Sequence, residues 1–259
     1  MGSLASVRQR SHLIGASLLV AVLVAVGALV AFAPNQAYAS STKNVWVVTK
    51  IVHKTSDDYE ESSETNVISY NSAGLIKKFS YGSYPTVFSY DKKNRMISEK
   101  SYGSKKSVFK LDKKGRVVGF KGNKNYVQYD SNGHANKAML GLLRKYTYSK
   151  SGLLMKMTGQ GGMGDIKQTY VYDSKKQIKK YYASEAGEGY TFNIKNTYSG
   201  SKLVKRQITS KVGSDTIVYK YKRVAVPKSV LAKVKAQQRW VFTEELPYAY
   251  APYLPSVTK

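Results

Sequence analysis

A short phrase of sequence returns about every twenty residues through most of this chain. Its first residue, the anchor, is tyrosine in all but one copy, and successive anchors lie 18 to 26 residues apart. Self-similarity of this kind is typical of an array built from one repeated supersecondary unit. The copies read YNSAGLI from Tyr70, YDKKNRM from Tyr90, LDKKGRV from Leu111, YDSNGHA from Tyr129, YSKSGLL from Tyr148, YDSKKQI from Tyr172 and YSGSKLV from Tyr198.

Each copy predicts a hairpin turn. The Asp, Asn or Ser that follows the anchor can accept hydrogen bonds from its own backbone and so start a turn. In the first five copies Gly or Asn stands four residues after the anchor, and these residues tolerate the left-handed conformation. A type I turn closed by such a residue commonly joins two antiparallel strands. Lys176 and Lys202 take this position in the last two copies, so we expect their turns to differ or to be strained.

The residues around each turn alternate between apolar and polar, the pattern of a strand with one buried face. A second turn signal stands about half a repeat later, as at Gly82, Gly103 and Gly122. Each unit is therefore predicted to hold two strands and two turns. A sheet of so many strands twists, and its apolar face needs cover. We predict an all-β fold in which repeated antiparallel β-hairpins form one large curled sheet or open barrel.

The anchor tyrosines allow two interpretations. Beside many lysines, they could be stacking platforms for sugars, quaternary amines or single-stranded nucleic acid. Tyr is also a favoured strand residue, whose ring covers a sheet face while its hydroxyl stays in water. The fixed place of the tyrosine before each turn favours the structural role.

The first 39 residues have the layout of an export signal. Arg8 and Arg10 precede an apolar stretch from Leu13 to Phe32, and Ala37-Tyr38-Ala39 provides a cleavage site. We therefore predict a signal peptide at residues 1–39. The alternative is an uncleaved membrane anchor, because about 20 apolar residues can span a bilayer.

The rest of the chain is predicted to divide in two. Residues 40–226 form the β-hairpin repeat domain, and residues 227–259 hold one C-terminal helix and an extended tail. Pro227 suits the first turn of a helix. We expect this helix to plug or cap the apolar face of the sheet.

The chain is strongly basic and lacks cysteine. It has 42 Lys and Arg against 16 Asp and Glu, a formal net charge of +26, which becomes +24 without residues 1–39. Such a surface attracts polyanions, although lysines also keep the strands of a large sheet from adding to one another. The lack of Cys excludes disulfides, a thiol nucleophile and Cys-ligated zinc, and it suits an exported bacterial envelope protein.

FSYDKKNRMISEKSYGS and YVYDSKKQIKKYY resemble the YD repeats of Rhs-type bacterial secreted and surface proteins. The resemblance covers about residues 66–210. It implies a β-hairpin array in an exported setting, and it offers no catalytic residues to transfer. This chain is short for the closed shell of that family and loses the turn glycine in its late copies. A weaker resemblance links it to the aromatic repeats of choline- or glucan-binding wall modules, which depend on Trp; here Trp46 and Trp240 lie outside the repeats.

Few residues suggest chemistry. His53 and His134 show no metal-ligand spacing and are interpreted as ordinary strand and turn residues. The acidic segment 57–64 could hold a hard cation, but it lacks an ordered ligand pattern and is interpreted as a solvated loop. GQGGMGD, residues 159–165, lacks a phosphate-loop ending and is interpreted as a hairpin loop. We predict no catalytic, cofactor-binding or metal-binding residues; an enzyme would need acids such as Asp57 and Glu61 gathered with His53 in a cleft.

The sequence therefore favours an exported, non-catalytic β-repeat protein. It is expected to be secreted or associated with the bacterial cell envelope and to bind an anionic cell-envelope polymer or glycan. The alternative is a structural spacer or adhesin-like module with a protein partner. Membrane contact is expected only if the N-terminal segment stays uncleaved.

Overall fold

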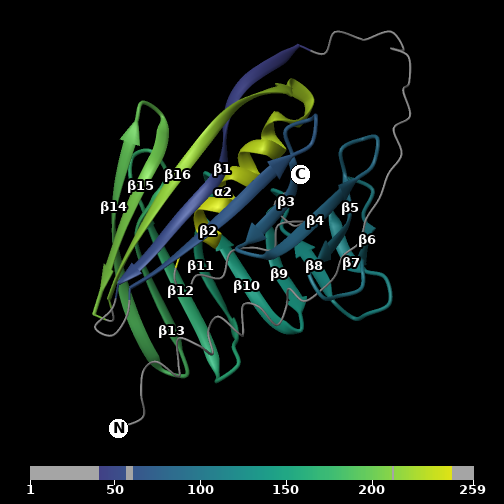
Figure 1. The fold of residues 1–259 in the computed structure, drawn as a ribbon. Coiled ribbons are helices and arrows are strands. Elements are labelled where there is room, and N and C mark those ends of the chain that lie inside the picture. Colours follow the sequence, from purple (N-terminus) through teal and green to yellow (C-terminus); the bar gives the residue numbers. More distant parts are fainter. Residues whose placement is uncertain (1–40, 57–60, 212, 247–259) are drawn as a thin grey trace.

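The computed structural model describes residues 41–56, 61–211 and 213–246 of the chain (Figure 1). The predicted signal peptide and most of the predicted tail lie outside these residues. The strands are β1 (Thr42–Ser56), β2 (Glu61–Tyr70), β3 (Ile76–Tyr81), β4 (Tyr84–Tyr90), β5 (Met96–Ser101), β6 (Ser107–Leu111), β7 (Val117–Phe120), β8 (Tyr126–Tyr129), β9 (Ala135–Leu140), β10 (Leu142–Tyr148), β11 (Leu154–Gln160), β12 (Asp165–Tyr172), β13 (Ile178–Glu185), β14 (Glu188–Ser199), β15 (Lys202–Ser210) and β16 (Gly213–Pro227).

All of these strands pair with their sequence neighbours in antiparallel fashion and form one closed barrel. The predicted all-β array of hairpins is confirmed, and the sheet closes fully where we expected a curled sheet or an open barrel. Closure depends on β1, which pairs with β16 from Thr42↔Pro227 to Ser56↔Ser214 and with β2 on its other side. Pairing the two ends of the array removes the edges that an open sheet would present.

The turn after each anchor follows the predicted mechanism. In the second copy, Asp91 Oδ1 accepts hydrogen bonds from the backbone N–H groups of Lys93 and Arg95, each at 2.9 Å. Asn94 closes this turn with a φ of 55°. Successive turns are stacked: a Cβ on Gly115, whose φ is +77°, would lie 2.6 Å from Cδ of Arg95 in the preceding turn. The glycine is thus required both by its conformation and by the close approach of its neighbour.

The anchor tyrosines join each hairpin to the preceding one. Their rings pack against the core of the barrel. Four of their hydroxyls donate to backbone carbonyls instead of staying in water, and the Tyr198 hydroxyl donates to Asp173 Oδ2 at 2.5 Å. The structural role therefore holds, with a bond that the sequence pattern did not indicate. The hydroxyl-to-carbonyl pairs are Tyr70 to Val48, Tyr90 to Ile76, Tyr129 to Val117 and Tyr172 to Leu154, and Tyr221 on β16 makes the same bond to Leu203.

A β-bulge lies in the strand after each repeat turn, next to the residue that pairs with the anchor, and it adds one outward-facing side chain per repeat. Between β8 and β9, for example, Gln128 pairs with Lys137 and Tyr129 pairs with Ala135, so Asn136 has no opposite residue. Asn136 and Lys137 both lie away from the core, while Ala135 and Ala138 are buried. Two consecutive residues therefore point outward at this place, as expected where a strand carries one extra residue.

The predicted C-terminal helix is confirmed and lies against the inner side of the barrel near β1, β2 and β3 (Figure 1). A short 3-10 turn, η1 (Lys228–Val230), leads into α2 (Leu231–Glu244). Trp240 and Val241 belong to the main core, where the Trp240 ring lies 5.4 Å from Phe79. The helix thus covers apolar residues of the sheet, which is the plugging role we expected.

Two glutamines fix α2 to irregular places of the wall. Gln237 Oε1 accepts a hydrogen bond from the Ile76 N–H at 2.8 Å, and its Nε2 donates to the Tyr90 hydroxyl at 3.0 Å. Gln238 makes the same pair of bonds, with the Val48 N–H and the Tyr70 hydroxyl. Ile76 and Val48 stand beside the register shifts of their strands. Since buried N–H groups need partners, the helix side chains supply bonds that the sheet does not make there.

The two late turns behave in the two ways that we predicted. Lys176 adopts the left-handed conformation of the earlier glycines, with a φ of 61°. The turn before Lys202 is shorter, because Ser199 pairs directly with Lys202 and only two residues connect the strands. Gly200 supplies the positive φ, 59°, in this shorter turn.

Replacing Lys176 with glycine should stabilise the protein. A non-glycine residue in the left-handed region costs on the order of 1 kcal/mol or more, while glycine adds about 0.5–1 kcal/mol of unfolded-state entropy. We therefore expect a net gain of up to about 1 kcal/mol, measured by urea unfolding. Lys113→Gly is the matched control: Lys113 is exposed and is not among the described residues with positive φ. A gain in the control as large as in Lys176→Gly would contradict the explanation.

Candidate binding site

The two histidines lie where the sequence placed them, and each has an acidic partner. His53 is on β1, with Nε2 3.2 Å from Asp215 Oδ1. Burial lowers the pKa of His53, but its bond and its attraction to Asp215 outweigh burial and raise the pKa overall. His134 lies at the end of a repeat turn, with Nδ1 3.3 Å from Asp130 Oδ2. Its ring stacks on the Tyr148 ring, with 4.7 Å between the centroids.

The other predicted segments form no site among the described residues. Asp57, Asp58 and Glu60 lie outside the described part of the chain, and Glu61 and Glu64 are exposed on β2. The predicted hairpin loop at residues 159–165 is shorter in the structure: residues 161–164 form it, while Gly159, Gln160 and Asp165 belong to β11 and β12. Within the described ranges, no group of three or more His, Asp or Glu side chains could hold a metal ion.

Two adjacent carboxyl groups at the end of α2 are held inside the barrel. Glu245 is buried and accepts hydrogen bonds from Asn66 Nδ2 at 3.2 Å, and Glu244 accepts one from the Tyr81 hydroxyl at 3.0 Å. Burial raises the pKa of each carboxyl to about 7, against smaller opposing effects of their partners. Sequence reasoning missed this pair, because a Glu-Glu step at a helix end normally indicates a solvated face.

A shallow groove opens on the barrel wall where the strands are poorly paired. β7 and β8 have four residues each, and Gly119↔Tyr126 is their single register pair. The neighbouring pair β8–β9 keeps a longer register, from Tyr126↔Met139 to Tyr129↔Ala135. Beside the short register of β7 and β8 lies a groove of about 540 Å³.

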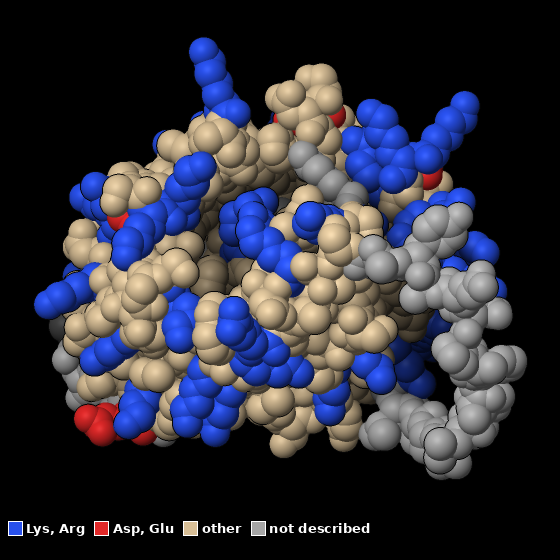
Figure 2. Space-filling view, turned by 90° about the horizontal axis from the view of Figure 1, so that it is seen from above, with Lys and Arg blue, Asp and Glu red and all other residues tan. Residues whose placement is uncertain are grey.

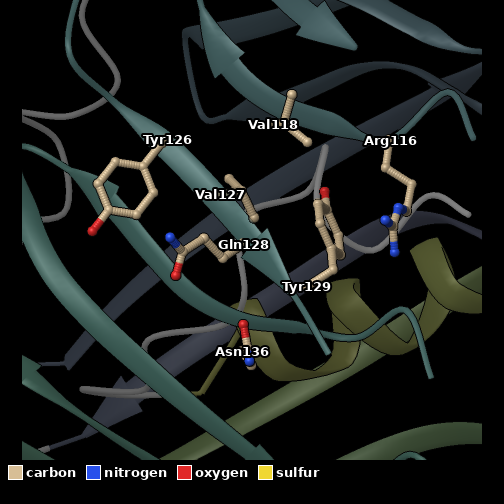
Figure 3. A pocket seen from close by; sticks show the side chains of 7 residues that line it. All are labelled: Arg116, Val118, Tyr126, Val127, Gln128, Tyr129 and Asn136. Carbon is tan, nitrogen blue, oxygen red and sulfur yellow. The ribbon is translucent and has the colours of Figure 1, made fainter. Parts of the chain in front are cut away.

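The groove combines aromatic, amide and cationic groups (Figure 3). Its lining residues are Arg116, Val118, Tyr126, Val127, Gln128, Tyr129 and Asn136. Tyr126 and Arg116 lie toward opposite sides of the view, with the amide groups of Gln128 and Asn136 between them. Such amides can donate and accept hydrogen bonds with hydroxyl groups, and a tyrosine ring offers an apolar face. This set of groups is suited to a polar, ring-containing ligand.

Arg116 is fixed in position by two partners. Its guanidinium carbon lies 4.3 Å from the centroid of the Tyr129 ring, and its Nε donates to Asp112 Oδ2 at 2.7 Å. Burial acts to raise the pKa of Asp112, but the hydrogen bonds from Arg116 outweigh it and lower the pKa. A second hollow of about 160 Å³ adjoins Arg116 and is lined also by Lys114, Ser131, Asn132 and Gly133. Basic and polar groups therefore continue from the groove to the repeat turns.

The sequence pattern did not indicate this groove. Arg116 and Tyr129 belong to the repeated phrase, which predicts a turn rather than a site, and the other lining residues are ordinary strand positions of the third and fourth copies. One available signal was Gly119 inside a strand, since such a glycine often marks a close approach of another backbone. A Cβ at Gly119 would lie 3.4 Å from the Asn125 carbonyl oxygen.

Basic side chains surround the barrel. Figure 2 shows Lys and Arg projecting on all sides of the end seen from above, with only a few acidic residues, around a hollow near the middle. Along the described parts of the chain, no helix is long and apolar enough to cross a membrane. The excess of positive charge is thus spread over the wall rather than confined to one element.

No protein-family model and no curated protein matches this sequence. Some solved structures are similar at low identity. A TcdB2–TccC3–Cdc42 complex has 13% identity and a TM-score of 0.33, covering 65% of this chain and 12% of that one. The Photorhabdus luminescens Tc holotoxin pore has 15% identity and a TM-score of 0.31, covering 60% and 9%.

A porin-like protein from Bacteroides uniformis has 11% identity and a TM-score of 0.33, covering 68% of this chain and 98% of that one. This chain spans only about an eighth of the length of the chain that it matches in the TcdB2–TccC3–Cdc42 complex. All three TM-scores lie below 0.5, so these similarities carry no argument about function. The β-repeat architecture itself is established by the strand pairing described above.

Proposed function

We propose that this chain is an exported, non-catalytic protein of the YD-repeat kind, secreted or held at a bacterial cell envelope, that binds anionic envelope polymers or glycans. The observation that carries the proposal is the groove of Tyr126, Gln128, Asn136 and Arg116 on a strongly basic wall. Aromatic and amide groups would contact sugar rings and hydroxyls, and the surrounding lysines would attract negative charge. The export-signal pattern of residues 1–39 supports the exported location.

Binding to isolated bacterial envelopes across a salt series tests this function. Residues 40–259 should be retained at low salt and released steeply as salt rises, because attraction between exposed charges is screened. Retained protein is measured after sedimentation. Full recovery in the supernatant at low salt would contradict the proposal, and the positive charge would then serve solubility.

A protein-binding or adhesin-like function is the second candidate, and an exposed aromatic pair favours it. Tyr84 and Tyr102 are 64% and 44% exposed, and their rings lie 5.4 Å apart in an edge-to-face arrangement. Exposed tyrosines are enriched at protein interfaces. Retention that survives high salt and is lost in Tyr84→Ala would favour this candidate over polymer binding.

A further inference from the structure

We propose that the groove continues into a track of lysines across β9, β10 and β12, and that the ligand is a linear polymer of sugar or sugar-alcohol units with a negative charge on successive units. The proposal rests on the proposed function and deepens it, because it defines the path and the class of polymer. We call Lys137, Lys145 and Lys167 the lysine track.

The register of the strands places the track in one row on the outer face. Gln128 pairs with Lys137, Lys137 with Lys145, Lys145 with Thr158, and Thr158 with Lys167. The neighbours of these residues along the strands, such as Ala138, Tyr146 and Ile166, are buried. Since side chains alternate between the two faces of a strand, the row lies on the outside of the barrel.

The three lysines of the track do not stabilise the sheet. Lys137 and Lys145 stand directly opposite each other on adjacent strands, and like charges in such positions repel. No acidic residue belongs to the row, and no ion pair within the described parts of the chain involves the three lysines. An anionic ligand that bridges them would remove this repulsion.

The groove and the track form one continuous surface. Gln128 lines the groove and is also the register partner of Lys137. The ammonium group of Lys137 lies 5.9 Å from the centroid of the ring of Tyr126, which also lines the groove. The bulge at Asn136 brings an amide next to Lys137 on the same face. A chain bound at the groove can therefore reach the lysines without crossing apolar surface.

The spacing of the lysines favours a polymer over a single anion. Adjacent strands lie about 4.8 Å apart, so Lys145 is roughly 5 Å from Lys137 and roughly 10 Å from Lys167 in the direction across the strands. Lys156, also exposed, stands on β11 two residues from Thr158 and extends the positive surface. One small anion cannot contact all of these groups, whereas a chain with repeated charges can. Lysine acts as a point charge without the fork geometry of Arg, so either carboxylate or phosphate groups are suitable.

The test compares two triple variants that lose the same charge. The track variant is Lys137→Ser, Lys145→Ser and Lys167→Ser. The control variant is Lys54→Ser, Lys195→Ser and Lys205→Ser, on β1, β14 and β15, where two side chains are exposed and one is half-buried, as in the track. Residues 40–259 are titrated with polygalacturonate, which carries a carboxylate on each unit, with poly(glycerol phosphate), and with neutral dextran.

We expect the track variant to bind the charged polymers about tenfold or more weakly at low salt, and the slope of log affinity against log salt to fall by about two to three. The control should lose less than about threefold, and the wild type should not bind dextran. Affinity of the wild type should rise with polymer length. The preferred polymer of the two identifies carboxylate or phosphate as the recognised anion.

The outcomes separate this inference from the function on which it rests. Equal losses in both triple variants would overturn the track while the proposed polyanion binding remains. If the wild type binds neither charged polymer but is still retained on envelopes in a salt-sensitive way, only the proposed class of polymer is overturned. Absence of retention on envelopes as well would overturn both. Misfolding is checked by thermal unfolding, and the track variant should be at least as stable as the wild type because it removes the Lys137–Lys145 repulsion.

Discussion

Replacing Arg206 with alanine is expected to lower the free energy of unfolding by roughly 3 kcal/mol or more. Arg206 lies on β15 and is 0% exposed. It donates to the Phe242 carbonyl of α2, to Gln177 Oε1 at 3.1 Å and to Asn196 Oδ1 at 3.2 Å. Removing the side chain would leave these three acceptors without this donor, and each buried group without a partner costs about 1–3 kcal/mol.

The same substitution should loosen α2. Arg206 connects the barrel wall to the helix backbone, and its guanidinium carbon lies 6.0 Å and 5.7 Å from the centroids of the Tyr219 and Phe242 rings. The cavity left by alanine would reduce packing against Phe242 in addition to the lost bonds. We therefore expect faster hydrogen exchange in residues 231–244 even under conditions where the barrel stays folded.

Arg223→Ala is the matched control for this prediction. Arg223 is exposed on β16, and its guanidinium carbon lies 5.9 Å from the centroid of the exposed Trp46 ring, so its loss should cost at most about 1 kcal/mol. Both variants lose one positive charge, so a difference between their urea midpoints reports burial and bonding rather than net charge. Equal midpoints for Arg206→Ala and wild type would mean that the arginine does not anchor the helix.

The hairpin array was predictable because every copy carries its own local instructions. The side chain after the anchor and the residue with positive φ act within one turn, as Asp91 and Asn94 show. Tyr221 was missed as a further anchor, although it makes the same hydroxyl-to-carbonyl bond as Tyr172. No turn follows it, so the local phrase that defines a copy is lacking there.

Closure and the candidate site depend on contacts between distant parts of the chain. The pairing of Trp46 with Arg223 joins the two ends of the array, and no turn residue marks it in the sequence. The groove lies beside the short register between β7 and β8, which no local phrase marks in the sequence. The lysine track was visible only as excess charge until the register placed Lys137 opposite Lys145.

Raising the pH from about 5 to 8 is expected to destabilise the protein. The pKa values of Glu244 and Glu245 are raised by burial to about 7 in the folded protein from an ordinary 4.5. Between these values the folded state holds protons that the unfolded state has released, so the free energy of unfolding falls as pH rises. Each carboxyl contributes on the order of 3 kcal/mol to this fall. His53 acts in the same direction, because its raised pKa gives stability that is lost as pH rises through its folded value.

The aspartates of the repeat turns are expected to make the protein less stable at low pH. Burial acts to raise the pKa values of Asp91, Asp112, Asp130 and Asp173, but hydrogen bonds lower them overall. For the first three these bonds lie within the turn, whereas Asp173 also accepts from Tyr198 and Asn196 on β14. Their stabilisation is present above the ordinary pKa of 3.8 and is lost as pH falls through the lowered values. Stability should therefore be greatest between about pH 4 and 5, a range that thermal unfolding at a series of pH values can locate.

Glu245→Gln distinguishes this cause from a general effect of pH. Glutamine can keep an acceptor for Asn66 but cannot ionise beside Glu244, Glu64 and His53, the charged groups that act on this position. The variant should lose part of the fall in stability between pH 5 and 8, on the order of 3 kcal/mol. Glu188→Gln, at an exposed position on β14, should keep the wild-type profile. A wild-type profile that is flat from pH 5 to 8 would show that the interior carboxyls are ionised without cost, and the burial of α2 against the barrel wall would then need a different explanation.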